Sequence, residues 1–250
     1  MSSSPLADDG PGSPPAPPVL SEVPALDRSG AGTDGPAQAD ADALTCEGLA
    51  AGRWPGVSVV MPVLNEERHL RDAVARVLGQ DYPGPLEVVL ALGPSRDRTD
   101  QIARTLAERD GRVTAVPNPS GRTPAGLNAA IHASRHPIVV RVDGHGMLPP
   151  GYVRTAVELL ARTGAANVGG MMAAEGETPF ERAVACAMTS PVGVGGAAFH
   201  TGGQEGPADT VYLGVFRRSM LEELGGYDES FVRAQDWELN YRIRSHGGLV

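Results

Sequence analysis

The chain has 250 residues, of which 41% are hydrophobic and 4% aromatic, and its net charge at pH 7 is -9. This length suffices for one domain with a substantial core and an appendage. Residues 1–52 hold eight acidic residues and one arginine, so the remainder carries a net charge of only -2. A nearly neutral folded part argues against a nucleic-acid-binding surface.

All 21 basic residues are arginines, which excludes Schiff-base and P-loop chemistry based on a lysine of this sequence. Cys46 and Cys186 are too few and too far apart for a disulfide framework or a zinc cluster, so a reducing compartment fits best. The N-terminus lacks the basic and apolar segments of a secretory signal. No apolar run approaches the ~20 residues needed to span a bilayer.

The chain divides into a tail and a folded domain. Residues 1–52 are rich in Pro, Gly, Ala, Ser and Asp, which predicts a disordered acidic tail before a domain over 53–250. Within this domain, apolar β-branched runs alternate with segments of helical apolar spacing. In chain order we expect strand 57–61, helix 70–78, strand 86–92, helix 99–109, strand 112–116, helix 124–134, strand 137–142, helix 152–162, strand 167–172 and helix 179–188. This alternation predicts an α/β fold with a doubly wound, mostly parallel sheet and helices on both faces.

A candidate metal site follows the fourth predicted strand, in the segment Arg141-Val142-Asp143-Gly144-His145. Asp143 and His145 are both potential metal ligands, two positions apart. Open α/β sheets bind ligands at the carboxyl ends of their strands, where this loop is expected to lie. A surface turn is the alternative interpretation, because Asp-Gly is a common turn dipeptide.

Loops after the first three predicted strands carry polar residues that can meet a nucleotide, namely Pro62, Asn65 and Glu66, then Ser95 and Asp97, then Arg122 and Asn128. Pro62 is expected to end the first strand. A helix start can bind phosphate or ribose, and a guanidinium matches phosphate geometry. Each loop is also compatible with a simple helix cap, and Arg122 with a solvated side chain.

Two features near the C-terminus can serve an acceptor. Asp236 begins a predicted helix and is a candidate general base, with an N-cap as the alternative, and Glu238 and Arg242 are spaced for an i,i+4 pair. The Gly-rich stretch 193–206, followed by Asp209-Thr210-Val211-Tyr212, is a candidate acceptor-side lid. A disordered loop is the alternative for this stretch.

In order and spacing, these motifs resemble the family 2 inverting glycosyltransferases, which have a GT-A fold. The resemblance runs from about Val57 to Gly248. The segments Pro149-Pro150-Gly151-Tyr152 and 235–242 resemble the succinoglycan or exopolysaccharide biosynthesis type most closely. The resemblance implies divalent-metal-dependent transfer of a sugar from a nucleotide-sugar donor to a hydroxyl of a glycan or lipid-linked acceptor. It further implies exopolysaccharide or cell-envelope glycan synthesis in the cytoplasm, with any association with the inner membrane face being peripheral or carried by sequence beyond Val250.

The resemblance also implies roles for single residues. Asp236 would be the catalytic base, and Asp143 and His145 would hold Mg²⁺ or Mn²⁺ against the diphosphate. The expected nucleotide-binding residues are Pro62, Asn65, Glu66, Ser95, Asp97, Arg122 and Asn128.

The sequence departs from the family pattern at several positions. Leu92 and Gly93 stand where an Asp usually reads uracil, so uridine is not implied as the base. His145 replaces an Asp of the metal motif and removes one negative charge, and Gln235 stands where an acid often precedes the base. The family's downstream motifs are absent before Val250, so we expect a truncated or unusually short domain.

Two rival functions stay open. A sugar nucleotidyltransferase also uses a doubly wound nucleotide domain, but the chain lacks a Gly-rich signature loop with an associated Arg or Lys near the first strand. A non-catalytic nucleotide-sugar-binding or scaffold protein on the same fold agrees with the departures from the family pattern. The retention of Asp143 and Asp236 at the two chemically demanding positions argues against it.

Overall fold

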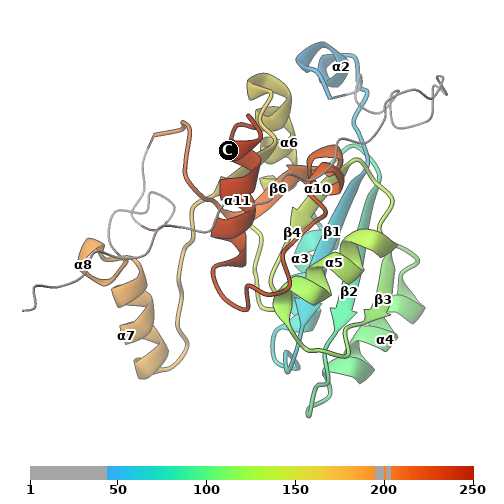
Figure 1. The fold of residues 1–250 in the computed structure, drawn as a ribbon. Helices are drawn as coiled ribbons and strands as arrows, with labels where there is room; N and C mark the ends of the chain where they lie inside the picture. Colours follow the sequence, from blue (N-terminus) through green and yellow to red (C-terminus); the bar gives the residue numbers. More distant parts are fainter. Residues whose placement is uncertain (1–43, 195–199, 201–203) are drawn as a thin grey trace, which may run out of the picture. The chain divides into compact units, whose positions relative to one another are not determined.

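The computed structural model describes residues 44–194, 200 and 204–250 (Figure 1). All of these residues fall within one compact unit that spans Asp34–Val250. In chain order, the helices and strands of the described part are α2 (Cys46–Ala50), β1 (Val57–Val63), α3 (Leu70–Leu78), β2 (Leu86–Leu92), α4 (Thr99–Arg109), β3 (Val113–Pro117), α5 (Thr123–Ala133), β4 (Ile138–Arg141), α6 (Tyr152–Thr163), β5 (Asn167–Gly170), α7 (Pro179–Met188), α8 (Pro191–Val194), β6 (Tyr212–Arg217), α10 (Arg218–Glu223) and α11 (Gln235–Ser245).

The strands form one six-stranded sheet in the order β3-β2-β1-β4-β6-β5. β1 pairs in parallel with β2 and β4, and β2 with β3, whereas β6 runs antiparallel to β4 and β5. The chain progresses to one side of β1 through β2 and β3 and then returns to its other side with β4. Loops diverge at such a switch point and leave room for a ligand at the carboxyl ends of the strands. The predicted mostly parallel, doubly wound sheet is confirmed, and β6 is an addition to the prediction.

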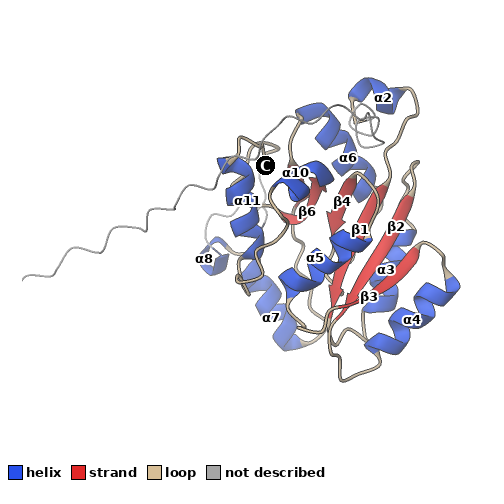
Figure 2. Cartoon of the chain, turned by 45° about the vertical axis from the view of Figure 1, so that its right-hand side comes forward, coloured by secondary structure: helices blue, strands red, loops and turns tan. Residues whose placement is uncertain are grey.

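Helices cover both faces of the sheet (Figure 2), and apolar side chains pack between the sheet and the helices on each face. Strand side chains alternate between the faces, so Val59 and Met61 of β1 pack with α3, α4 and α6, while Val60 packs with α5, α10 and α11. Each helix contributes one apolar stripe, as Leu70, Ala73, Val74 and Val77 do on α3. These two layers hold the sheet rigid beneath the loops at its carboxyl edge.

Pro62 lies inside β1 rather than at its end, contrary to the sequence-based expectation. The carbonyl of Val60 accepts a hydrogen bond from Val142 N, so the backbone polar groups of Val60 point toward β4. Backbone direction alternates along a strand, so the backbone nitrogen of Pro62, two residues on, points to the same side. The last β1–β4 pair is Val60 with Arg141. Pro62 therefore faces a position where β4 has already ended, and its missing N–H costs no ladder hydrogen bond.

The N-terminal boundary of the folded part differs from the prediction. Leu44 is buried in the core, and Thr45 caps α2 by accepting a hydrogen bond from Gly48 N at 3.0 Å. Residues 44–52 therefore belong to the folded part, because a buried leucine and a capped turn outweigh the Pro/Gly-rich composition before them. The rest of the predicted tail, residues 1–43, and most of the candidate lid, residues 195–199 and 201–203, lie outside the described residues.

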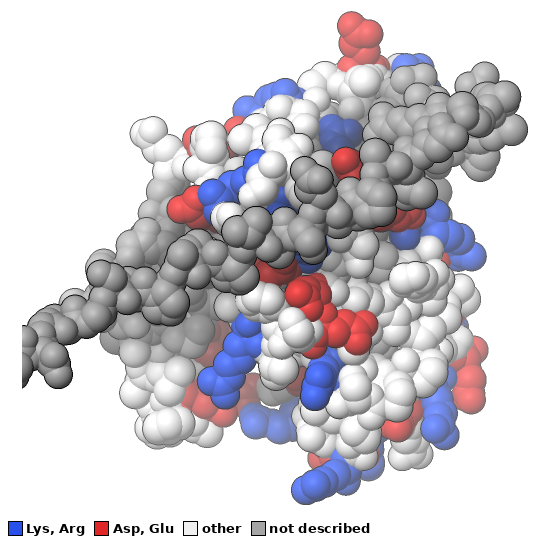
Figure 3. Space-filling model, viewed as in Figure 1, with Lys and Arg blue, Asp and Glu red and all other residues white. Residues whose placement is uncertain are grey.

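The surface is mixed in charge. Arginines and acidic side chains are interspersed over the face drawn in Figure 3, where no broad basic area is visible among the described residues. Within the same part of the chain, no helix is both long and apolar enough to cross a membrane.

Candidate functional site

The loops after β1 and β2 are fastened to each other at the carboxyl edge of the sheet. Their hydrogen bonds run from Asn65 N to Ser95 Oγ (3.1 Å), from Glu66 N to Thr99 Oγ1 (2.7 Å), from Glu67 N to Asp97 Oδ2 (3.2 Å) and from Arg96 N to Asn65 Oδ1 (2.8 Å). Four of the residues predicted to line a nucleotide, Asn65, Glu66, Ser95 and Asp97, thus take part in one loop–loop contact.

Asn65 and Asp97 both serve this contact between the loops. Asn65 does not cap α3, whose N-cap is His69; it adopts a left-handed conformation with φ 57° and bridges to the second loop instead. The Thr99 hydroxyl and three backbone N–H groups lower the pKa of Asp97 below its usual range, against the opposing effect of burial. Asp97 is therefore an anionic brace between the two loops.

The end of β4 carries a charged cluster made of Arg141, Asp143 and Asp236. Arg141 is paired with Val60 and therefore faces the layer of α5, α10 and α11, and Asp143, two residues on, follows the same alternation. Arg141 Nη2 donates to Asp143 Oδ1 at 2.8 Å, and Arg141 Nη1 donates to Asp236 Oδ2. Asp236 is the second residue of α11, whose N-cap is Ala234, so Asp236 is not itself the cap. Two of the predicted site residues are thus joined through one guanidinium.

Tyr227 completes this cluster from beneath. Its hydroxyl donates to Asp236 Oδ1 at 3.4 Å, and its ring is buried against Phe216. Burial raises the pKa of Tyr227 well above its usual range, and the charge of Asp236 adds to this effect. Tyr227 therefore stays protonated and acts as a hydrogen-bond donor.

Glu66 and His145 form a second pair beside the cluster. His145 Nδ1 lies 2.8 Å from Glu66 Oε1, and the two residues are 79 positions apart in the sequence. The hydrogen bond with Glu66 raises the pKa of His145, while burial opposes it. Gly144 permits the approach, because a Cβ on it would lie 2.8 Å from Glu66 Cγ and 3.0 Å from Val63 Cγ1. The candidate metal loop and the first loop are therefore in direct contact.

Asn128 holds the turn that precedes α11. Its Oδ1 accepts a hydrogen bond from Tyr227 N at 2.9 Å, and its Nδ2 donates to Tyr227 O at 2.9 Å and to Glu229 Oε1 at 3.0 Å. Gly226, with φ 76°, passes so close that a Cβ on it would lie 2.6 Å from Asn128 Oδ1. The structure thus engages the amide of Asn128 in a contact that fixes Tyr227.

The remaining predicted residues lie apart from the charged cluster. Arg122 is the N-cap residue of α5 and its side chain is exposed; within the described part, no hydrogen bond joins its guanidinium to the other predicted residues. Pro62 lies near the first turn of α5, where a Cβ on Gly126 would approach Pro62 Cβ to 3.2 Å. The expected Glu238–Arg242 pair is confirmed, with Arg242 Nε 2.5 Å from Glu238 Oε1.

Asp143 and His145 supply two candidate ligands for a divalent cation, so the remaining ligands must come from elsewhere. The described residues contain no cluster of three or more His, Cys, Asp or Glu side chains suited to a metal ion. Mg²⁺ and similar hard cations are often held by one or two protein oxygens, with the other ligands supplied by substrate phosphates and water. The contact of His145 Nδ1 with a carboxylate leaves Nε2 as the other ring nitrogen, an arrangement found around metal-binding histidines. The residues therefore fit a cation that is shared with a diphosphate.

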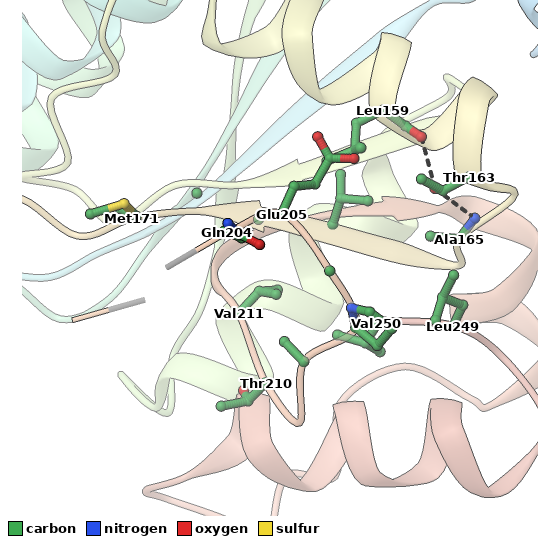
Figure 4. Close-up of a pocket in the computed structure, with 16 residues that line it drawn as sticks. Leu159, Thr163, Ala165, Met171, Gln204, Glu205, Thr210, Val211, Leu249 and Val250 are labelled. Carbon is green, nitrogen blue, oxygen red and sulfur yellow. Dashed lines mark hydrogen bonds between the residues drawn. The ribbon is translucent and has the colours of Figure 1, made fainter. Parts of the chain in front are cut away.

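A separate cavity of about 290 Å³ lies beside the edge strand β5 (Figure 4). Its lining is mostly apolar and includes Leu159, Val168, Met171, Glu205, Val211 and Val250. From the expected acceptor-side region, Gln204, Glu205 and Gly206 of the Gly-rich stretch and Thr210 and Val211 after it contribute to the lining. None of the predicted catalytic, nucleotide-binding or metal-binding residues lines this cavity, so it does not mark the charged cluster.

Sequence reasoning missed two members of the cluster, Arg141 and Tyr227. A signal for Arg141 was present, because it is a lone charge in an apolar strand and lies two positions before Asp143. Charged residues are rarely buried unless they are paired, so a strand arginine beside two candidate aspartates indicates a partner. Tyr227 carried no comparable signal.

Comparison with known proteins adds an independent line of evidence. A sequence profile described as glycosyl transferase family 2 matches residues 58–225. The succinoglycan biosynthesis protein ExoA of Rhizobium meliloti (strain 1021) is 35% identical over 191 residues, which cover 76% of this chain and 58% of that protein. An undecaprenyl-phosphate 4-deoxy-4-formamido-L-arabinose transferase of Pseudomonas paraeruginosa is 34% identical over 114 residues, which cover 42% of this chain and 32% of the transferase.

Among solved structures, the mannosyltransferase PcManGT from Pyrobaculum calidifontis, in complex with GDP-Man and Mn²⁺, has a TM-score of 0.58 at 23% identity. The match covers 85% of this chain and 65% of that one. At this identity the likeness shows a shared fold, namely that of the GT-A glycosyltransferases. The chain spans less than two thirds of the length of each of these three proteins.

Proposed function

Because the chain belongs to glycosyl transferase family 2, we propose that it transfers a sugar from a nucleotide-sugar donor to a hydroxyl group of a glycan or lipid-linked acceptor. One observation carries the proposal: Asp143 and Asp236, 93 positions apart in the sequence, meet through Arg141 at the carboxyl edge of the sheet, next to the β1/β4 switch point. Ligands of open α/β sheets bind at this location.

The donor side of the site lies at the ends of β1 and β4. Asp143 and His145 would hold a divalent cation, Mg²⁺ or Mn²⁺, that is shared with the diphosphate, and Glu66 orients His145 through its contact with Nδ1. When bound, such a cation offsets the negative charge that gathers on the leaving diphosphate. PcManGT, with its bound GDP-Man and Mn²⁺, supports the use of a nucleotide sugar and a divalent cation by similarity of fold. The loop–loop contact that contains Asn65, Ser95 and Asp97 forms the wall of the nucleotide pocket, with Pro62, Arg122 and Asn128 nearby.

The acceptor side of the site lies at the start of α11. Asp236 accepts the proton of the attacking hydroxyl, and in-line attack by that hydroxyl inverts the anomeric centre. General-base assistance is typically worth ~10²–10⁴ in rate. Tyr227 donates to Asp236 Oδ1 and Arg141 to Oδ2, so both oxygens are held before the acceptor arrives.

The relatives support an acceptor in exopolysaccharide or cell-envelope glycan synthesis. One is named for succinoglycan biosynthesis and another for transfer involving undecaprenyl phosphate, so a growing glycan and a lipid-linked glycan, each with a free hydroxyl, belong to the proposal. A cytoplasmic location and a peripheral association with the inner membrane face are further parts of it.

The test is a panel of nucleotide sugars incubated with the protein, Mn²⁺ or Mg²⁺, and short glycans and polyprenyl-linked glycans as acceptors, with release of free nucleoside diphosphate as the readout. We expect one donor to give metal-dependent release. Asp143→Ala should abolish it, and Asp236→Asn should lower turnover by ~10²–10⁴ while the donor still binds. Nucleotide binding without turnover would instead identify a non-catalytic binding protein, and an Asp236→Asn variant with unchanged turnover would remove Asp236 from the role of base.

A further inference from the structure

Arg141 is a buried charged residue that is paired with two acidic side chains. Only 10% of its side chain is exposed, and the residues before it in β4 are buried apolar side chains. Burial acts to lower the pKa of Arg141, but the negative charges of Asp236 and Asp143 outweigh it and the pKa is raised. A buried guanidinium is tolerated only when such partners compensate for its lost hydration. Both compensating partners are residues that the proposed function uses.

The hydrogen bonds of Arg141 divide the oxygens of the two carboxylates. Nη2 takes Asp143 Oδ1, and Nη1 takes Asp236 Oδ2. Asp236 Oδ1 is left on the side of the Tyr227 hydroxyl. Within the described part of the chain, no protein hydrogen bond engages Asp143 Oδ2, which is therefore available to a cation. The planar guanidinium fork fixes the direction of both bonds at once.

We propose that Arg141 is a positioning residue that couples the cation-binding carboxylate Asp143 to the base Asp236, so that one rigid group sets the separation and orientation of both. The inference rests on the proposed function. Without Arg141, two carboxylates would face each other at a half-buried edge and repel. With Arg141, a change at either carboxylate alters the share of the guanidinium that the other receives.

This coupling predicts that a change at Asp236 alters the affinity of the protein for Mn²⁺. When Asp236 is replaced by Asn, Arg141 has Asp143 as its one anionic partner, and the Arg141–Asp143 ion pair becomes tighter. A cation then competes less well for Asp143. We expect Asp236→Asn to weaken Mn²⁺ binding at least threefold, measured by electron paramagnetic resonance of free Mn²⁺ in the presence of the nucleoside diphosphate released from the active donor.

The variant Arg141→Lys separates positioning from charge. Lysine keeps the positive charge but is a compact donor without the planar fork, so it cannot orient both carboxylates together. We expect kcat to fall about 10- to 100-fold with the KM for the donor changed less than threefold, since small misplacement of reacting groups has costs of that order. In the Arg141→Lys background, Asp236→Asn should no longer shift the Mn²⁺ affinity.

Arg112→Lys is the matched control, because Arg112 also pairs with an aspartate two positions away, Asp110, at an exposed site. It should leave kcat, KM and Mn²⁺ affinity unchanged. If Arg141→Lys does not fold, the single variant Asp236→Asn still tests the coupling through its Mn²⁺ affinity.

The outcomes distinguish the two proposals. A wild-type protein that transfers sugar, combined with a Mn²⁺ affinity that Asp236→Asn leaves unchanged, would overturn the coupling and leave the proposed function standing. An Arg141→Lys variant with wild-type kcat would do the same. A wild-type protein that transfers no sugar from any donor would overturn the proposed function, and the role of Arg141 in transfer with it.

Discussion

Replacing Asn128 by Ala separates two roles for this residue, contact with a nucleotide and support of the turn before α11. The structure favours the second role, because the Asn128 amide both accepts from Tyr227 N and donates to Tyr227 O. Tyr227 is buried, so Asn128→Ala leaves its backbone N–H and C=O without these partners. The hydroxyl of Tyr227 in turn contacts Asp236.

The magnitude follows from these contacts. Each intramolecular hydrogen bond contributes about 0.5–1.5 kcal/mol net, so the two bonds to Tyr227 together contribute about 1–3 kcal/mol. The third bond, to Glu229, lies at an exposed position and adds little. For a domain of this size, 1 kcal/mol corresponds to roughly 2–4 °C in Tm. We therefore expect Asn128→Ala to lower Tm by about 2–12 °C and to lower kcat as Tyr227 and Asp236 lose their fixed positions.

The assay is thermal unfolding followed by steady-state kinetics at a temperature well below both transitions. Asn128→Asp should destabilise at least as much as Asn128→Ala, because its second carboxylate oxygen would lie against Tyr227 O and Glu229 Oε1 although Tyr227 N keeps an acceptor. Gln101→Ala, an exposed amide on α4, is the control and should change stability by no more than ~0.5 kcal/mol. An unchanged Tm together with a raised KM for the donor would refute the turn-support reasoning and favour direct nucleotide contact.

Two further predictions concern the packing around the site. Gly144→Ala would place a Cβ 2.8 Å from Glu66 Cγ, so the candidate metal loop and the first loop must separate. Metal-dependent activity should therefore fall about tenfold or more. Gly111→Ala, where a Cβ would meet nothing within 4 Å, is the control and should keep full activity; equal activities of the two variants would contradict this reasoning. Ser58→Ala removes a buried hydroxyl that donates to Glu87 Oε1 at 2.7 Å and accepts from His136 N at 3.0 Å. Urea unfolding should show a loss of about 1–3 kcal/mol with kcat retained, and a free energy of unfolding equal to that of the wild type would count against this buried contact.

Much of the fold is readable from local patterns in the sequence. Val57–Met61 and Leu86–Leu92 are short apolar runs, and Leu70–Leu78 repeats apolar residues at helical spacing, so each element follows from its own residues. The alternation of these elements is enough to predict a doubly wound sheet, which the structure confirms. Residue type and motif order likewise single out Asp143, His145 and Asp236 as candidates, although their roles are still proposals.

The sequence-based predictions were wrong or incomplete where a residue's structure depends on segments that are distant along the chain. A proline generally ends a strand, but the backbone nitrogen of Pro62 points to the side on which β4 has already ended. The β1–β4 register decides this. Asn65 is a good capping residue, yet the second loop lies close enough to capture its side chain. The strand β6 contains a glycine and follows a Gly-rich stretch, and its pairing with β4 and β5 becomes visible only in the assembled sheet.

The amino-acid sequence by itself therefore determined most of the elements, the fold class and the chemical candidates, because these depend on residues that are near one another along the chain. Only the tertiary structure decided which candidates meet. Glu66 reaches His145 across 79 positions, Arg141 reaches Asp236 across 95, and Asn128 reaches Tyr227 across 99. Contacts at such separations depend on strand order and register, which bring the ends of β1 and β4 and the start of α11 to one edge of the sheet.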